Sequence, residues 1–258
     1  MTRTQLLRRV WLFAELADDE LEQIARLARE RTCRSGEVLM HQGEASGELF
    51  TVIQGRLKVV STAPEGDEVL LSVIGAGEVF GELALLDDLP RSATVCAVEH
   101  CRLLVVPRAS FRPLLLRMPT LGLRLLQIMA GHVRRLSSRT EDATTLDVRT
   151  RLAKTVHELS VRFGIPGPGG SIRVTLRFSQ QELGRLVGAT REMINKCLRE
   201  LAASGAVRHE KGALTVLKPE RLQAAAEGLD LRTSKNTRTR GRRPPKMPRP
   251  TRPRGRRA

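Results

Sequence analysis

Hydrophobic and polar positions change their spacing several times along the chain. Apolar residues recur at helical spacing over residues 11–30, which predicts a helix there with its start near Ala17–Leu21, beside Asp18 and Asp19. From residue 30 to 107 the pattern becomes short strand-like runs separated by glycines, with eight glycines between Gly36 and Gly81. Many short strands with glycine turns are typical of a small barrel or sandwich, because glycine adopts positive φ at little cost. We therefore predict an antiparallel β-barrel or roll over residues 30–107.

A long helix is predicted after this strand-rich region. Pro119 stands where a first-turn proline commonly begins a helix. From there to about Ala143 the apolar residues fall three or four positions apart, at Leu121, Leu125, Ile128 or Met129, Val133 and Leu136. One narrow apolar stripe on so long a helix is typical of a coiled-coil seam, although packing against its own domain is the alternative. The pattern favours a homodimer interface.

Two short helices joined by a tight turn are predicted further on, after an amphipathic helix and a strand over residues 146–178. Ser179 and Glu182 have the spacing of a capping box, which starts the first short helix. Gly188 marks the turn, and Thr190 can cap the second short helix. This is the arrangement of a helix-turn-helix, and the residues that follow it fit a two-stranded wing.

The polar face of the second short helix has side chains that can read bases. Arginine and lysine donate to guanine N7 and O6, and a carboxylate accepts from cytosine N4. In a helix-turn-helix these contacts come from the N-terminal residues of the second helix, which enters the major groove. An ordinary solvated face is the alternative for this segment taken alone. The expected DNA-binding residues are Ser179, Gln180, Thr190, Arg191, Glu192, Asn195 and Lys196.

The net charge supports a nucleic-acid partner but is unevenly distributed. The 258 residues include 44 Lys and Arg against 28 Asp and Glu, a formal charge of +16. Twelve of the basic residues and no acidic ones lie in residues 231–258, which leaves 32 against 28, or +4, for the rest. A segment so poor in apolar residues cannot offset its chain entropy, so we expect a disordered basic tail. That tail is either a non-specific polyanion tether or a solvated extension without a role.

The remaining composition excludes several classes of protein. The apolar runs fall far short of the roughly 20 residues that a membrane helix needs, and no signal peptide is visible. Four cysteines and five histidines are scattered, so we expect no disulfide framework, metal, haem or iron–sulfur cluster. No nucleophile–base pair stands out, so we expect no enzyme. These features indicate a cytoplasmic, nucleoid-associated protein without a membrane partner.

Polar residues late in the strand-rich region indicate a ligand site. Gly81 permits a close backbone approach, and Glu82 can accept a hydrogen bond from a sugar hydroxyl. Nine residues after Glu82, Arg91 supplies a forked, permanently charged donor, and Ser92 adds a hydroxyl. An anion-facing set beside a diol-facing acid describes a ribose phosphate pocket. A structural ion pair between Glu82 and Arg91 is the alternative.

The ordered combination of these features resembles the CRP/FNR family of bacterial transcription regulators, over about residues 10–225. The shared residues are the β-roll glycines, the cassette Gly81-Glu82-Leu83 through Pro90-Arg91-Ser92-Ala93, Leu146-Asp147-Val148 and Thr190-Arg191-Glu192. The resemblance implies a ligand-binding β-roll, a long dimerisation helix and a winged helix-turn-helix. It also implies that Glu82 takes the ribose 2′-hydroxyl, while Arg91, Ser92 and the backbone at Gly81 and Leu83 hold a cyclic phosphate.

One position departs from the cAMP-responsive pattern of that family. Counting back from Asp147 places the adenine-contacting pair at Leu136 and Ser137, where the pattern expects a hydroxyl residue at the first position. Leu136 cannot hydrogen-bond a base, and an unpaired buried purine edge costs roughly 1–3 kcal/mol. Ser137 stays in the expected ligand set. On the DNA side, Lys196 stands where many members have arginine, and lysine reaches guanine as a point charge.

We therefore expect an α+β protein in four parts. These are a cyclic-nucleotide-binding antiparallel β-roll (1–118), a dimerisation helix (119–145), a winged helix-turn-helix domain (146–225) and a disordered basic Pro/Arg-rich tail (226–258). The expected function is a homodimeric regulator that binds double-stranded DNA at an inverted repeat and responds to a cyclic nucleotide such as cAMP, with RNA polymerase as a further partner. Two alternatives stay open: a family regulator that needs no small ligand, and a cyclic-nucleotide-binding module that acts through protein contacts.

Overall fold

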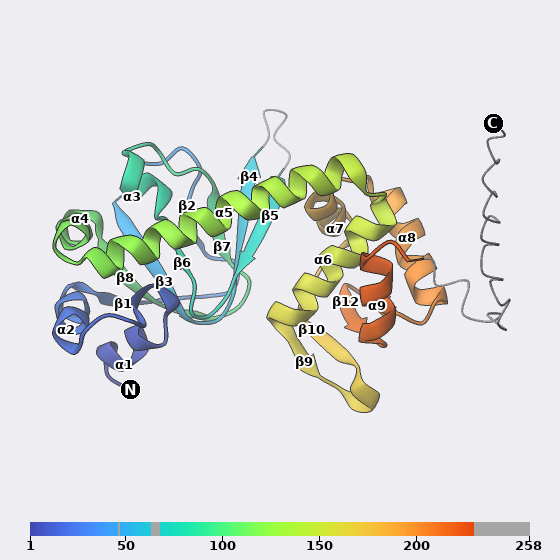
Figure 1. Cartoon of the computed structure of the whole chain (residues 1–258), viewed down its shortest axis with the longest axis horizontal. Coiled ribbons are helices and arrows are strands. Elements are labelled where there is room, and N and C mark those ends of the chain that lie inside the picture. Colours follow the sequence, from blue (N-terminus) through green and yellow to red (C-terminus); the bar gives the residue numbers. More distant parts are fainter. Residues whose placement is uncertain (46, 63–67, 230–258) are drawn as a thin grey trace, which may run out of the picture.

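The computed structural model describes residues 1–45, 47–62 and 68–229, and the expected basic tail lies outside the described residues from residue 230 onward. A strand-rich N-terminal part and a mainly helical C-terminal part lie at the two ends of one long helix, α5 (Pro119–Thr145) (Figure 1). None of the described helices is long and apolar enough to cross a membrane. The predicted α+β class, with its order of roll, long helix and helix-turn-helix, is confirmed.

Two short helices and a 3-10 turn precede the strands. They are α1 (Arg3–Arg8), η1 (Trp11–Phe13) and α2 (Asp18–Leu27). The helix predicted within residues 11–30 begins in the predicted interval Ala17–Leu21 but ends at Leu27, before residue 30, and residues 11–13 form a separate 3-10 turn. The Glu20 carboxylate accepts a hydrogen bond from the Ala17 amide at 2.9 Å, which begins α2 only at Asp18. At the other end, the residues after Ala28 leave the helix to pair with a strand.

Two four-stranded antiparallel sheets form the roll. The first has the order β1-β8-β3-β6, and the second has the order β2-β7-β4-β5. The strands are β1 (Arg29–Cys33), β2 (Val38–Met40), β3 (Glu48–Gln54), β4 (Leu57–Thr62), β5 (Glu68–Ile74), β6 (Val79–Phe80), β7 (Thr94–Ala97) and β8 (Cys101–Pro107). Residues from both sheets, such as Phe50 and Val95, share one buried cluster. The roll predicted from the glycine-punctuated strands is confirmed.

Helix α5 packs against the roll along only part of its length. The short helices α3 (Leu83–Asp87) and α4 (Arg108–Arg117) come before it. Leu121 and Leu125 are buried in the N-terminal cluster, whereas Leu126, Val133 and Leu136 are exposed. The stripe predicted from sequence therefore mixes two faces: its first two residues pack on their own domain, and its last two lie on the surface. We call Leu126, Val133 and Leu136 the exposed stripe.

The C-terminal part combines a helix-turn-helix with a four-stranded antiparallel sheet of order β11-β12-β10-β9. Its elements are α6 (Val148–Phe163), β9 (Gly164–Pro166), η2 (Pro168–Gly170), β10 (Ile172–Arg177), α7 (Gln180–Val187), α8 (Arg191–Ala203), β11 (Val207–Glu210), β12 (Ala213–Val216) and α9 (Pro219–Ala226). The predicted two-stranded wing is the β11–β12 hairpin. Asp147 caps α6 by accepting a hydrogen bond from the Thr150 amide at 2.7 Å.

The two parts of the chain contact each other directly. Val60, Leu70 and Val73 of the second sheet belong to the same buried cluster as the helix-turn-helix residue Val187. Lys58 of β4 forms an ion pair with Glu182 of α7. The C-terminal part is therefore docked on the roll as well as tethered to it by α5.

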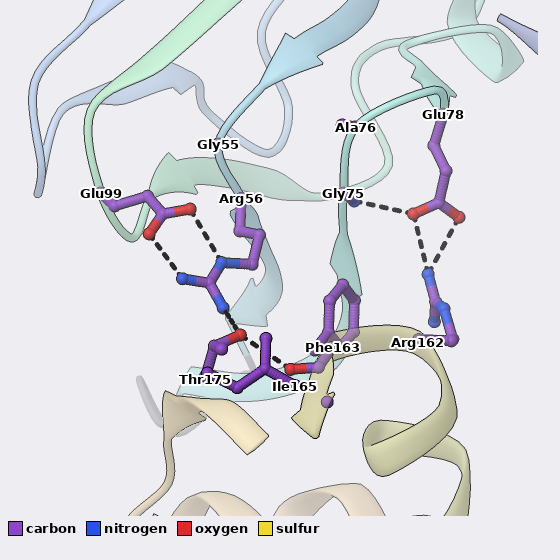
Figure 2. A pocket seen from close by; sticks show the side chains of 11 residues that line it. Gly55, Arg56, Gly75, Ala76, Glu78, Glu99, Arg162, Phe163, Ile165 and Thr175 are labelled. Atoms are coloured by element: carbon purple, nitrogen blue, oxygen red, sulfur yellow. Dashed lines mark hydrogen bonds and ion pairs between the residues drawn. The ribbon is translucent and has the colours of Figure 1, made fainter. Parts of the chain in front are cut away.

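Polar side chains border an open crevice of about 510 Å³ between the two parts (Figure 2). Arg56 is held by both carboxylate oxygens of Glu99, at 2.8 and 2.5 Å, and also donates to the Thr175 hydroxyl of β10. Across the crevice, Arg162 of α6 pairs with Glu78 at 2.8 Å. Each arginine that borders the crevice therefore already has a carboxylate partner.

Candidate functional site

Gly81 lies where the chain passes from β6 into α3, and only glycine fits there. Its φ is +83°, in the left-handed region. A Cβ at this position would lie 2.5 Å from a guanidinium nitrogen of Arg91 and 3.0 Å from the carbonyl oxygen of Glu48. Gly81 therefore lies where three segments meet: the start of α3, the segment before β7 that contains Arg91, and the start of β3.

Arg91 is buried and fixed by backbone groups. Its two terminal nitrogens donate to the carbonyl oxygens of Gly81 at 3.0 Å and Glu48 at 2.8 Å. The guanidinium also lies over the ring of Phe50, 5.6 Å from its centroid. Burial lowers the pKa of Arg91, and nearby carboxylates, Glu48 and Glu82 among them, oppose this shift. The guanidinium is thus a preorganised cation whose contacts within 4 Å include no carboxylate among the described residues.

Glu82 is the other buried charged residue of this site. It stands immediately before α3, with its side chain only 8% exposed. Burial raises the pKa of its carboxyl, while its own backbone amide and the charge of Arg91 act in the opposite direction. The alternative of a structural ion pair between Glu82 and Arg91 is not what the structure shows, since no ion pair within 4 Å joins these two residues. Instead, Nδ1 of His132 on α5 lies 3.6 Å from Oε1 of Glu82.

His132 was not among the residues singled out from the sequence. It lies seven residues, or two helical turns, after the buried Leu125, so both side chains face the roll. This spacing was available in the sequence, but sequence alone does not distinguish a lone histidine in this position from an ordinary surface residue. The structure shows that His132 connects the long helix α5 to Glu82, at the start of α3.

The remaining residues of the expected ligand set lie at the edges of the site. Leu83 begins α3 directly after Glu82. Ser92 and Ser137 are both exposed, and among the described residues no hydrogen bond joins either of them to Glu82 or Arg91. The structure therefore brings together Gly81, Glu82, Leu83 and Arg91, with Ser92 adjacent in the chain, and leaves Ser137 on the solvent side of α5.

The helix-turn-helix forms as its local signals predict. Ser179 Oγ accepts a hydrogen bond from the Glu182 amide at 3.1 Å, and Glu182 Oε2 accepts from the Ser179 amide at 2.8 Å. Gly188 ends α7 with φ +71°. A Cβ on Gly184 would lie 2.6 Å from the carbonyl oxygen of Ala189, so the turn between the two helices lies too close to α7 for a larger residue there. Thr190 then caps α8.

The outer face of α8 is open to solvent and polar. Arg191, Glu192 and Lys196 are exposed, and Asn195 is half-buried. Arg199, one turn further along, donates through Nε to the Asn195 side-chain oxygen at 3.2 Å. Arg199 was missed in the sequence, although its spacing of four from Asn195 places it on the same face. This face has the donors and acceptors needed at base edges, with Gln180 half-buried at the start of α7.

The cysteines are reduced and the described residues contain no group of three or more His, Cys, Asp or Glu side chains that could hold a metal. Cys33 and Cys101 lie opposite each other on β1 and β8. Burial raises the pKa of both thiols. They are therefore packing residues of the roll in this state.

Comparisons with known proteins agree with this architecture. The cyclic nucleotide-binding domain family matches residues 30–118, and the Crp-like helix-turn-helix domain family matches residues 150–225. The CRP-like cAMP-activated global transcriptional regulator of Mycobacterium tuberculosis is 30% identical over 222 residues, which cover 86% of this chain and 99% of that protein. The cyclic AMP receptor protein of Thermus thermophilus is 31% identical over 218 residues, covering 84% of this chain and 97% of that protein.

A solved structure shows the same arrangement. A transcriptional regulator of the CRP/FNR family from Thermus thermophilus has 26% identity and a TM-score of 0.64, and the match covers 77% of this chain and 98% of that one. The chain therefore belongs to the CRP/FNR family of transcription regulators. It is a DNA-binding regulator with a cyclic nucleotide-binding domain and a Crp-like helix-turn-helix.

Proposed function

We propose that this regulator is controlled by a cyclic nucleotide, with cAMP as the first candidate. The observation that carries the proposal is the buried guanidinium of Arg91, which has backbone carbonyls and an aromatic ring around it but, among the described residues, no carboxylate within 4 Å. A buried cation in that setting favours an incoming anion, because buried charges are costly unless paired. A cyclic phosphate supplies one negative charge. The names of the relatives, which describe cAMP-activated regulators, support the same ligand.

Each residue of the site has a role in this proposal. Arg91, Ser92 and the backbone at Gly81 and Leu83 hold the phosphate. Glu82 accepts a hydrogen bond from the ribose 2′-hydroxyl. Ser137, which lies on the solvent side of α5 in this structure, contacts the base in the ligand-bound arrangement. Because Glu82 is almost fully buried beside α5, a ligand held there is placed between the roll and the long helix.

On the DNA side, we propose a homodimer formed through the exposed stripe of α5. Arg191, Glu192 and Lys196 contact base edges, with Asn195 beside them, and a GTGA half-site is expected. The helices are positioned on the sugar-phosphate backbone of the DNA by Ser179, Gln180 and Thr190. A two-fold symmetric dimer binds an inverted repeat with half-sites about one helical turn apart. RNA polymerase as a further partner and a cytoplasmic location belong to the same proposal.

A regulator that binds DNA without any small ligand is the second candidate. Two observations favour it. The terminal nitrogens of Arg91 already donate to two carbonyl oxygens, so the segment is held without a ligand. Leu136, in the position where cAMP-responsive members have a hydroxyl residue, is exposed and offers no hydrogen bond to a base.

Titration calorimetry with cAMP and cGMP, followed by selection of DNA from a random library, separates these candidates. We expect micromolar binding of one nucleotide, and enrichment of an inverted repeat only in its presence. Enrichment of the same repeat without nucleotide, together with no binding below millimolar concentration, supports the ligand-independent regulator. Nucleotide binding without any enriched repeat supports a module that acts through protein contacts.

A further inference from the structure

His132 of the long helix α5 lies beside Glu82, at the start of α3. Its Nδ1 lies 3.6 Å from Oε1 of Glu82, and among the described residues it is the only basic side chain within 4 Å of that carboxylate. The Glu82 side chain is 8% exposed and the His132 side chain is 37% exposed. Water therefore screens this pair less than it would screen a fully exposed one.

Charged groups from three elements act on His132. On α5 itself, Arg135 opposes protonation of the imidazole. Glu78, in the connection between β5 and β6, favours protonation, but it also pairs with Arg162 of α6 and accepts a hydrogen bond from the Gly75 amide. Glu82, at the start of α3, faces the ring directly. Burial is the largest effect and lowers the pKa of His132, so the ring is mainly neutral in the empty site at neutral pH.

We propose that His132 is a positioning residue of the nucleotide site, which orients the Glu82 carboxylate toward the ribose and takes up a proton when an anionic cyclic nucleotide binds. The proposal rests on the proposed function, since it assigns a proton-linked step to the same site. The ligand class is a nucleoside cyclic phosphate with a free 2′-hydroxyl. The step forms no covalent bond: one proton moves from solvent to an imidazole nitrogen.

The direction of the pH dependence follows from linkage. A bound phosphate adds negative charge to the site, and an ionised Glu82 is required to accept from the 2′-hydroxyl, so binding raises the pKa of His132 above its value in the empty site. The resulting gain in affinity is complete below the pKa of the empty site. It is lost as the pH rises through the pKa of the occupied site. Each unit of difference between the two values corresponds to a tenfold change in affinity.

Titration calorimetry with cAMP on the full-length protein tests this inference. Affinity is measured between pH 6.5 and 8.5, and protons are counted by repeating each titration in buffers of different ionisation enthalpy. The variants are His132→Gln, which keeps a hydrogen-bonding group but cannot titrate, and His132→Arg, which is always charged. His100→Gln, in the exposed turn before β8, is the matched control.

We expect the dissociation constant of the natural protein and of His100→Gln to rise several-fold from pH 6.5 to 8.5. His132→Gln should show a flatter profile and take up fewer protons on binding, and His132→Arg should bind tightly across the range without proton uptake at this residue. The difference in proton number between the natural protein and His132→Gln measures the proton uptake that depends on His132. If the natural protein and His132→Gln show the same pH profile and take up the same number of protons on binding, the proposed role of His132 is overturned. Absence of cAMP binding in every protein, His100→Gln included, overturns the proposed ligand instead.

Discussion

Arg91 contributes both to the proposed ligand recognition and to the local structure of the site. Replacing it with alanine removes the cation and also leaves the carbonyl oxygens of Gly81 and Glu48 without their donors. A hydrogen bond to a charged group contributes about 1.5–3 kcal/mol. We expect Arg91→Ala to weaken cyclic nucleotide binding by about tenfold to 150-fold, as measured by calorimetry.

Arg91→Lys is the control for this prediction. Lysine keeps the charge but loses the forked geometry, so its affinity should fall between those of the natural protein and Arg91→Ala. Circular dichroism reports whether the roll remains folded in each variant. Unchanged affinity in a folded Arg91→Ala protein contradicts the assignment of the phosphate site.

Lys196 is expected to determine sequence preference at one base pair in each half-site. It is exposed on the outer face of α8, within reach of a base edge once the helix lies in the major groove. Lys196→Ala should cost about 1–3 kcal/mol on the preferred sequence and relax the preference at that position alone. Competition binding with every single-base variant of the half-site measures this.

Lys211, in the turn of the β11–β12 wing, gives the matched control. It is exposed and has φ +49°, so Lys211→Gly removes one positive charge where glycine fits the backbone. This variant should weaken binding to all sequences by the same factor. A changed base preference in Lys211→Gly, or an unchanged one in Lys196→Ala, contradicts the proposed readout.

At the residue scale, local spacing predicted that Glu82 and Arg91 lie together in the candidate site but not what they contact. Glu82 and Arg91 are close in the chain, so their proximity followed from the motif. The groups that accept hydrogen bonds from Arg91 could not be predicted from the motif. Glu48, for example, reaches the site only because β3 pairs within the first sheet. His132 comes from a helix that begins 37 residues after Glu82, and no local pattern connects the two.

At the scale of elements, α5 offers a direct test of dimer formation. The exposed stripe of Leu126, Val133 and Leu136 leaves apolar surface in water. A charge placed in a packed seam costs several kcal/mol, so Val133→Asp should weaken a dimer by about 100-fold or more. Analytical ultracentrifugation measures the effect.

Ser138→Asp is the control for this prediction. It adds the same charge at an exposed position two residues beyond Leu136 and should leave the dimer intact. A monomeric natural protein, or a Val133→Asp dimer of equal strength, contradicts the proposed interface.

Elements with local stop and start signals were predicted well. The capping box at Ser179 and the glycine at Gly188 fix the ends of α7 within the residues themselves. The face of α5 was harder to assign, because Leu121 and Leu125 continue the spacing of the exposed stripe although they pack on the roll. Periodicity shows that a helix has an apolar side, but where the helix leaves its own domain depends on tertiary packing.

At the scale of the whole molecule, the charge of the chain predicts how DNA binding responds to salt. Twelve basic residues lie in residues 231–258, outside the described residues, and the rest of the chain has a charge of only +4. Removing residues 231–258 should lower affinity for all DNA sequences equally. The slope of log affinity against log salt concentration should also become shallower, by about 0.9 for each phosphate that the protein no longer neutralises. Competition assays that show a changed consensus after the deletion contradict a purely electrostatic role for the tail.

The docking of the two parts on each other was beyond any sequence argument, since it depends on surfaces that lie far apart along the chain. Its consequence concerns how the protein unfolds. Val60, Leu70 and Val73 are buried in one cluster with residues of the helix-turn-helix, so neither part can melt without exposing apolar side chains of the other. Heat should therefore unfold the roll and the C-terminal part in a single cooperative calorimetric transition, and a chain cut between α5 and α6 should give fragments that melt at lower temperature than the intact protein.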